Sequence, residues 1–115
     1  MNDYRRAKRR KPSHQIDILD TMTEQVIGRL SNLSESGMLL ILRQPLVNDA
    51  LYQLRFTLPM PSGRDHCLDV GAHELWSDDA AAPGQVWTGF RFIDIDPADQ
   101  EQIRIWVEAP GSQYV

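Results

Sequence analysis

Apolar and polar residues alternate along most of this chain, and a period of two is the pattern of β-strands with one buried face. The alternation is clearest where Tyr52, Leu54, Phe56 and Leu58 are apolar and the residues between them are polar. Turn-forming residues interrupt the pattern at several points between about residue 14 and residue 93. We therefore predict six short strands, around residues 16–18, 26–30, 38–42, 52–58, 68–76 and 86–93.

Two of these strands depart from simple alternation. The segment Met38–Leu42 is apolar at every position, which predicts a strand buried on both faces. In the fifth strand the inward period continues to Trp76, with Glu74 as its one exception. Trp76 is therefore expected to pack in the core or at its rim, with contact to a ligand or partner as the alternative.

The pattern changes once, near the end of the chain. Asp96 followed by Pro97 is typical of a helix N-cap and first helical position. Ile103, Trp106 and Val107 then recur at helical spacing, and Trp106 is expected to anchor the helix on the strands. Six short strands and one terminal helix predict a mainly β fold, a small closed or nearly closed β-barrel with a C-terminal α-helix.

Charge divides the chain unevenly. Six of its twelve Lys and Arg residues fall within the first eleven positions, whereas fifteen of its sixteen Asp and Glu residues lie beyond them. We expect residues 1–13 to form a flexible basic arm, residues 14–109 the barrel and helix, and residues 110–115 a tail. A cationic arm on an acidic domain indicates an anionic partner.

Several classes of protein are disfavoured by what the sequence lacks. Its longest apolar run, Met38–Leu42, is too short to cross a membrane, and no apolar segment of a secretion signal follows the basic residues. Cys67 is the only cysteine, and His14, His66 and His73 lack the spacing of metal ligands. We expect a cytoplasmic protein that is not an enzyme, with no catalytic residues, no metal and no cofactor.

The polar segment between the second and third strands contains Asn32, Ser34 and Gly37. Two residues spaced by two in an extended chain project to the same side, so Asn32 and Ser34 can present hydrogen-bonding groups together. Gly37 permits either a left-handed turn or the close approach of a ligand or backbone. Taken alone, the segment is better interpreted as a polar hairpin turn than as a binding site.

The arginines of the arm repeat at a spacing of four, in Arg5 and Arg9 and again in Arg6 and Arg10. The planar guanidinium can chelate phosphate oxygens or the O6/N7 edge of guanine, and its face can stack on a base. Taken alone, such a run is most typical of a solvated tail or of a general polyanion contact.

The two features in this order are more specific together. An RxxxR motif followed by (D/N)xSxxG resembles the PilZ domain family, and here 23 positions separate Arg9 from Asn32. Trp76, the segment Gly89–Phe92 and the terminal helix also match positions typical of that family. The resemblance covers essentially the whole chain and implies a six-stranded antiparallel β-barrel.

The resemblance implies a receptor for the bacterial second messenger cyclic di-GMP. The arm would wrap over this ligand, with Arg5 and Arg9 as the clamp and Arg6 as a supporting phosphate or stacking contact. Arg6 and Arg10 form a second RxxxR, 22 positions before Asn32, and we favour Arg5 and Arg9 because only they have the doubled form RRxxR.

On the barrel, the resemblance makes Asn32 and Ser34 the residues that hydrogen-bond guanine, and Gly37 the turn that permits the ligand to approach. Asn32 stands where Asp is common in the family, and an amide offers a donor as well as an acceptor. Cyclic di-GMP, a dianion with two guanines, suits paired arginine forks beside an amide and a hydroxyl.

Three functions remain as hypotheses. The leading one is a stand-alone cyclic di-GMP receptor that relays the signal to a partner protein in motility, pilus, biofilm or virulence outputs. The second is a PilZ-type adaptor for type IV pilus or motility proteins that does not need the nucleotide. The third, binding of single-stranded nucleic acid, is disfavoured because the body is acidic and its aromatic residues lie on core-facing positions. We expect no nucleic-acid polymer and no membrane as partner.

Overall fold

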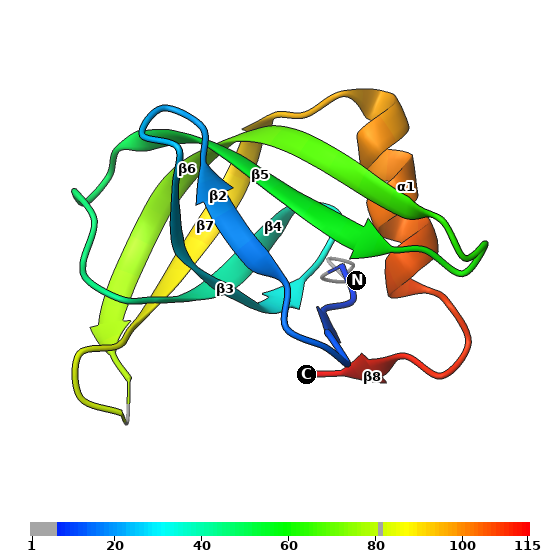
Figure 1. The fold of residues 1–115 in the computed structure, drawn as a ribbon, viewed down its shortest axis with the longest axis horizontal. Coiled ribbons are helices and arrows are strands. Elements are labelled where there is room, and N and C mark those ends of the chain that lie inside the picture. Colours follow the sequence, from blue (N-terminus) through cyan, green and yellow to red (C-terminus); the bar gives the residue numbers. More distant parts are fainter. Residues whose placement is uncertain (1–6, 81) are drawn as a thin grey trace, which may run out of the picture.

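A closed barrel of six antiparallel strands forms the body of the protein in a computed structural model that describes residues 7–80 and 82–115 (Figure 1). Around the barrel the order is β2-β5-β6-β7-β4-β3, and pairing of β3 with β2 closes it. This confirms the predicted six-stranded antiparallel barrel. Its strands are β2 (Asp17–Asp20), β3 (Gln25–Leu33), β4 (Gly37–Leu42), β5 (Leu51–Pro59), β6 (Asp65–Asp79) and β7 (Val86–Asp94).

The core lies inside the barrel and is built by the alternation that predicted the strands. On β5, Leu54, Phe56 and Leu58 are buried while the residues between them are exposed. Tyr52 continues the same face, and its ring meets that of Phe90 on β7 edge to face with centroids 6.0 Å apart. Burying each such apolar side chain contributes about 1.5–3 kcal/mol, so the inward face of the strands supplies most of the stability of the fold.

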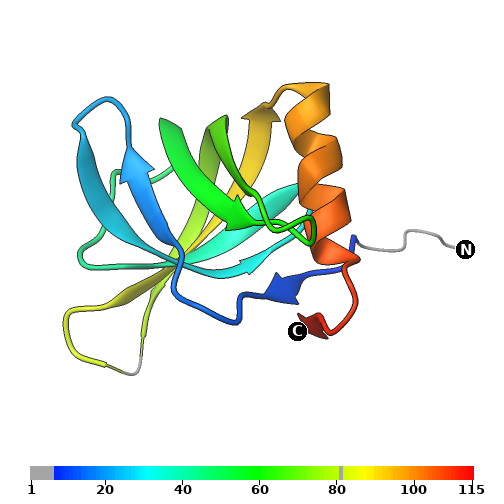
Figure 2. The same cartoon turned by 45° about the vertical axis from the view of Figure 1, so that its right-hand side comes forward.

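Helix α1 (Pro97–Val107) covers one end of the barrel, as Figures 1 and 2 show. The predicted cap is confirmed, because the side chain of Asp96 accepts a hydrogen bond of 2.8 Å from the amide of Ala98. The predicted anchor is also confirmed: Trp106 is 1% exposed and joins the core together with Ile103. A helix with this apolar face closes the barrel end against water.

Two short strands extend the sheet beyond β3, where we expected a flexible arm and a tail. The strand β1 (Arg10–Lys11) pairs with β3 through Arg10 and Leu33, and β8 (Gln113–Tyr114) pairs with the other edge of β1. In Figure 2 these two strands lie side by side below the end of the helix. The arm is thus ordered at Arg10 and Lys11, because β1 and β8 satisfy each other's backbone groups.

Trp76 does not face the core. Glu74 keeps the inward phase of Val70 and Ala72, and a β-bulge between Glu74 and Trp76 then shifts the register of β6 against β7, so Trp76 turns outward. Glu74 is 1% exposed and Trp76 is 49% exposed. On β4, Leu39 and Ile41 are half-buried on the outer face, so this strand is fully buried on one face only.

In the part of the chain that the structure describes, no helix has the length and apolar character needed to cross a membrane.

Candidate functional site

A hollow of about 280 Å³ lies on the outside of the barrel, where Arg9 of the basic arm meets residues of β3, β4, β6 and β7. Arg9 and Asn32 supply polar groups, while Leu39 and Trp76 supply apolar surface. Arg9 directly precedes β1, and Val115 directly follows β8. The hollow therefore combines a cation, an amide and an exposed indole within one small surface depression.

Arg9 and Asn32 contact each other directly. The Nη1 of Arg9 donates a hydrogen bond of 2.9 Å to Oδ1 of Asn32, across 23 positions of sequence. Because a guanidinium has only donors, the amide of Asn32 must turn its oxygen toward Arg9, which directs Nδ2 away from it. Asn32 is 4% exposed. The contact therefore fixes the orientation of an amide that is otherwise almost enclosed by the barrel wall.

Ser34 has a local role in the turn that joins β3 to β4. Its Oγ accepts hydrogen bonds from the amides of Ser36, at 3.2 Å, and Gly37, at 3.3 Å. The backbone amide of Ser34 donates to the carbonyl of Gly37 at 2.9 Å. Ser34 is 1% exposed and does not line the hollow. Asn32 and Ser34, which we expected to read guanine together, are therefore placed differently, with only Asn32 in the hollow.

Gly37 is required for a close approach of two strands. A Cβ on Gly37 would lie 2.3 Å from the carbonyl oxygen of Phe90, so any side chain would push β4 away from β7. Gly37 is not among the glycines of positive φ in the described residues. Of the two explanations that the sequence left open, the close approach of backbone is therefore the one that applies.

Trp76 lies against β7 because residue 89 is a glycine. A Cβ on Gly89 would meet three atoms of the indole, the nearest being Nε1 at 2.5 Å. The pyrrole part of the ring thus covers the backbone of Gly89. Since half of Trp76 remains exposed, its outer surface is open beside Arg9 and Asn32. A flat ring held in this way is suited to stacking on a base or a guanidinium.

Arg10 points away from the hollow. Its Nη1 donates to the backbone carbonyl of Trp106 at 2.6 Å, and its guanidinium carbon lies 4.2 Å from the centroid of the Trp106 ring. Desolvation by burial lowers the pKa of Arg10, opposed in part by the nearby Tyr114, but an arginine stays charged at neutral pH. Arg9 and Arg10 thus have different surroundings, although the sequence offered both as members of an RxxxR motif.

The remaining arginines of the two motifs, Arg5 and Arg6, lie outside the described residues. Of the residues that the structure does describe, Arg9, Asn32 and Trp76 come together, Gly37 and Ser34 shape the adjoining strands, and Arg10 contacts the helix.

The C-terminal segment is the part of the site that sequence reasoning missed. The amide of Val115 donates to the carbonyl of Arg9 at 3.0 Å, and Val115 lines the hollow. The Nζ of Lys8 lies 5.4 Å from the centroid of the Tyr114 ring. A two-residue strand carries no readable alternation, so only the apolar Tyr-Val pair after Pro110-Gly111 hinted that this end is ordered.

The other polar residues singled out by the sequence occupy separate places. Nε2 of His66 lies 2.8 Å from Oδ1 of Asp99, which ties β6 to the helix, and Cys67 is exposed. His73 contacts Asp49 at 2.5 Å. Within residues 7–80 and 82–115, no three His, Cys, Asp or Glu side chains gather closely enough to hold a metal ion.

Comparison with known proteins gives one family. A model of the PilZ domain matches residues 3–109. No curated protein sequence matches the chain.

Solved structures with a similar fold include the inhibitor of motility MotI/DgrA of Bacillus subtilis, with a TM-score of 0.74 and 14% identity over 92% of this chain. Escherichia coli YcgR in complex with c-di-GMP has a TM-score of 0.63 and 20% identity over 89% of this chain. The separate PilZ domain of YcgR with c-di-GMP has a TM-score of 0.60 and 19% identity over 89% of this chain and 87% of that one. The chain spans 51% of the MotI/DgrA chain and 43% of the longer YcgR chain.

Proposed function

This chain belongs to the PilZ domain family, and we propose that it is a receptor for cyclic di-GMP that binds its ligand at the hollow of Arg9, Asn32 and Trp76. The observation that carries the proposal is the hydrogen bond between Arg9 and Asn32, which joins the basic arm to the barrel surface at one place. The structures of YcgR with c-di-GMP, which share this fold, support the same class of ligand.

The chemistry of the hollow suits guanine. An arginine fork can donate to O6 and N7 of the base, and the amide of Asn32 can rotate to donate to the base or accept from it. The exposed indole of Trp76 offers a stacking surface for the base. A ligand that binds Arg9 exchanges the hydrogen bond between Arg9 and Asn32 for one of its own. Separating Arg9 from Asn32 therefore costs little free energy.

The basic arm supplies what the hollow lacks. At about 280 Å³ the hollow is slightly smaller than the range of about 300–1,000 Å³ for ligand pockets, so it accommodates part of a dinucleotide. The rest is covered by the part of the arm that precedes β1, where a dianion is matched by cationic side chains. We favour Arg5 as the partner of Arg9, with Arg6 in support, because Arg10 is engaged with Trp106.

The proposed output is a protein partner. The arm changes its contacts when the ligand takes the place of Asn32 as the hydrogen-bond partner of Arg9. A segment that moves between two arrangements can be recognised by another protein. We infer a cytoplasmic, non-enzymatic relay whose partner acts in motility, pilus, biofilm or virulence functions. One similar structure is described as an inhibitor of motility.

Isothermal titration of the full chain with cyclic di-GMP tests the proposal. We expect saturable binding that weakens roughly 10- to 100-fold in Arg9→Ala and in Asn32→Ala, because hydrogen bonds to charged groups contribute about 1.5–3 kcal/mol. Arg64→Ala is the matched control, since it removes the same charge from an exposed residue that does not line the hollow.

Two results would contradict the proposal. Absence of binding heat with wild-type protein in low salt excludes the ligand. Equal binding by wild type and Arg9→Ala excludes the site. If a partner captured from a lysate binds equally with and without cyclic di-GMP, the chain is an adaptor that ignores the nucleotide.

A further inference from the structure

The strand that carries Arg9 to the hollow is too short to hold itself in place. β1 contains two residues, with one paired position on β3 and two on β8. Isolated pairings of this length are marginal in water, because ordering the backbone costs more than a few hydrogen bonds contribute. Side chains must therefore add the contacts that keep the arm on the barrel.

Arg10 makes the first of these contacts. Its guanidinium stacks on the ring of Trp106 and donates to the carbonyl of the same residue, at the C-terminal end of α1. Helix C-termini attract cations, and Trp106 is fixed in the core. The Nε of Arg10 is buried without an acceptor among the described residues, so the ring face and Nη1 together hold the side chain.

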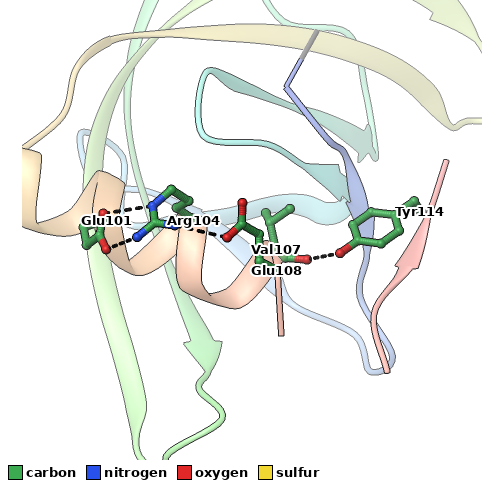
Figure 3. A network of polar contacts seen from close by, with 5 residues as sticks. All are labelled: Glu101, Arg104, Val107, Glu108 and Tyr114. Atoms are coloured by element: carbon green, nitrogen blue, oxygen red, sulfur yellow. Dashed lines mark hydrogen bonds and ion pairs between the residues drawn. The ribbon is translucent and has the colours of Figure 1, made fainter. Parts of the chain in front are cut away.

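Tyr114 makes the second contact from the opposite edge of β1. Its hydroxyl donates to the carbonyl of Val107 at 2.7 Å, as Figure 3 shows. Tyr114 pairs with Arg10 across the two strands, and the next residue, Val115, donates its amide to the carbonyl of Arg9. β8 is thereby anchored to the last turn of the helix and, in turn, anchors the arm.

These contacts orient Arg9. Arg9 precedes β1, and its carbonyl continues the pairing with β8. Successive side chains of an extended chain point to opposite faces, so fixing Arg10 against the helix directs Arg9 toward Asn32. We propose that Arg10, Trp106 and Tyr114 form a strap that positions Arg9, so that residues outside the hollow set the affinity of the site. This inference rests on the proposed function, and it adds positioning residues that the RxxxR and NxSxxG motifs do not identify.

The strap acts by pre-organisation. An arm that is already in place loses less conformational freedom when it closes on a ligand, so loosening the strap weakens binding without removing any ligand contact. By the same linkage, ligand binding tightens the contact of β8 with the helix end.

Titration of the full chain with cyclic di-GMP, comparing two strap variants with one control, tests the inference. Arg10→Lys keeps the charge but loses the planar fork, and Tyr114→Phe loses only the hydroxyl. We expect binding to weaken about tenfold in Arg10→Lys and about three- to tenfold in Tyr114→Phe. The control Lys11→Ala removes a charge from the same strand at an exposed side chain and should change binding less than about threefold.

A second readout distinguishes positioning from general loss of stability. In ligand-free protein, the side-chain amide resonances of Asn32 should shift in Arg10→Lys and Tyr114→Phe toward their positions in Arg9→Ala. Thermal unfolding confirms that each variant is folded. Wild-type Asn32 resonances in both strap variants, or a loss of binding in Lys11→Ala equal to that in Arg10→Lys, would overturn the inference.

The inference and the proposed function fail in different ways. If wild-type protein binds no cyclic di-GMP, the proposed function is wrong, and the Asn32 resonances still decide whether the strap positions Arg9. If wild-type protein binds and Arg9→Ala does not, while both strap variants bind like wild type, only the strap is wrong.

Discussion

Arg9 and Arg10 are neighbours in sequence with opposite environments, and the difference follows from the geometry of an extended chain. Arg9 reaches Asn32 on the outside of the barrel, whereas Arg10 stacks on a buried tryptophan of the helix. Two overlapping RxxxR motifs are thus separated by the opposite directions in which Arg9, just before β1, and Arg10, its first residue, point. The spacing of the arginines alone does not contain this information, because either register satisfies it.

Gly89 provides a prediction at this scale. Gly89→Ala places a methyl group 2.5 Å from Nε1 of Trp76, so the indole must move off the strand. We expect a loss of stability of about 1–3 kcal/mol in urea unfolding, typical of overpacking, and weaker binding of cyclic di-GMP. Trp76→Ala removes the clash, so the double variant should be no less stable than Trp76→Ala alone. If the double variant instead loses the sum of the stabilities lost in the two single variants, Trp76 does not lie on Gly89.

At the scale of elements, the helix links the two ends of the chain to the barrel. Its inner face carries the buried Trp106, its C-terminal carbonyls accept from Arg10 and Tyr114, and its outer face holds a row of charges. In that row Arg104 bridges Glu101 and Glu108, with 3.0 Å from its Nε to Oε1 of Glu101 (Figure 3). Loosening of the helix end would therefore weaken the contacts that Arg10 and Tyr114 make with it.

The Glu101–Arg104 pair makes the stability of this element depend on pH. The hydrogen bond from Arg104 lowers the pKa of Glu101 below its ordinary value. The positive charge of Arg104 lowers this pKa further. A carboxylate whose pKa is lower in the folded state stabilises the fold above its unfolded pKa, and this contribution is lost as pH falls through the folded value. Glu101→Gln should lower Tm slightly at neutral pH and leave it unchanged in acid below the folded pKa. A Tm difference that persists there would contradict this assignment.

At the scale of the whole molecule, the proposed site lies where Arg9 and Val115 meet residues of β3, β4, β6 and β7. A larger groove of about 500 Å³ lies elsewhere, beside the part of β2 that diverges from β5. It is lined by Ile16, Phe56 and Arg55 among others, and it lacks the contact between arm and barrel. Volume alone therefore does not identify the site in this molecule.

Amide chemical shifts on adding cyclic di-GMP test this placement. We expect changes in residues 4–11 and 32–37, together with Trp76 on β6 and Gln113–Val115 at the C-terminus, because Arg9, Asn32, Trp76 and Val115 line the hollow. Residues along the groove between β2 and β5 should not shift and act as an internal control. Shifts concentrated in residues 14–19 and 55–59 would place the ligand in the larger groove.

Some of this could be predicted from the sequence because the information is local. Alternation specified the six strands, and Asp96, Pro97 and Trp106 specified the start and inner face of the helix. The bulge at Glu74 and Trp76 could not be predicted, since an extra residue in a strand leaves each local pattern intact and reverses only its phase. The local role of Ser34 was equally hidden, because its hydroxyl bonds within its own turn.

The sequence by itself determined the barrel, the helix and the family, because burying alternating apolar faces and capping a helix depend on residues close together in the chain. Tertiary structure alone decided which arginine meets Asn32, that Trp76 faces outward beside them, and that the C-terminal strand holds the arm. Those outcomes depend on contacts such as Arg10 with Trp106 and Val115 with Arg9, whose partners lie about a whole chain length apart. Only the closed fold brings such partners within hydrogen-bonding distance.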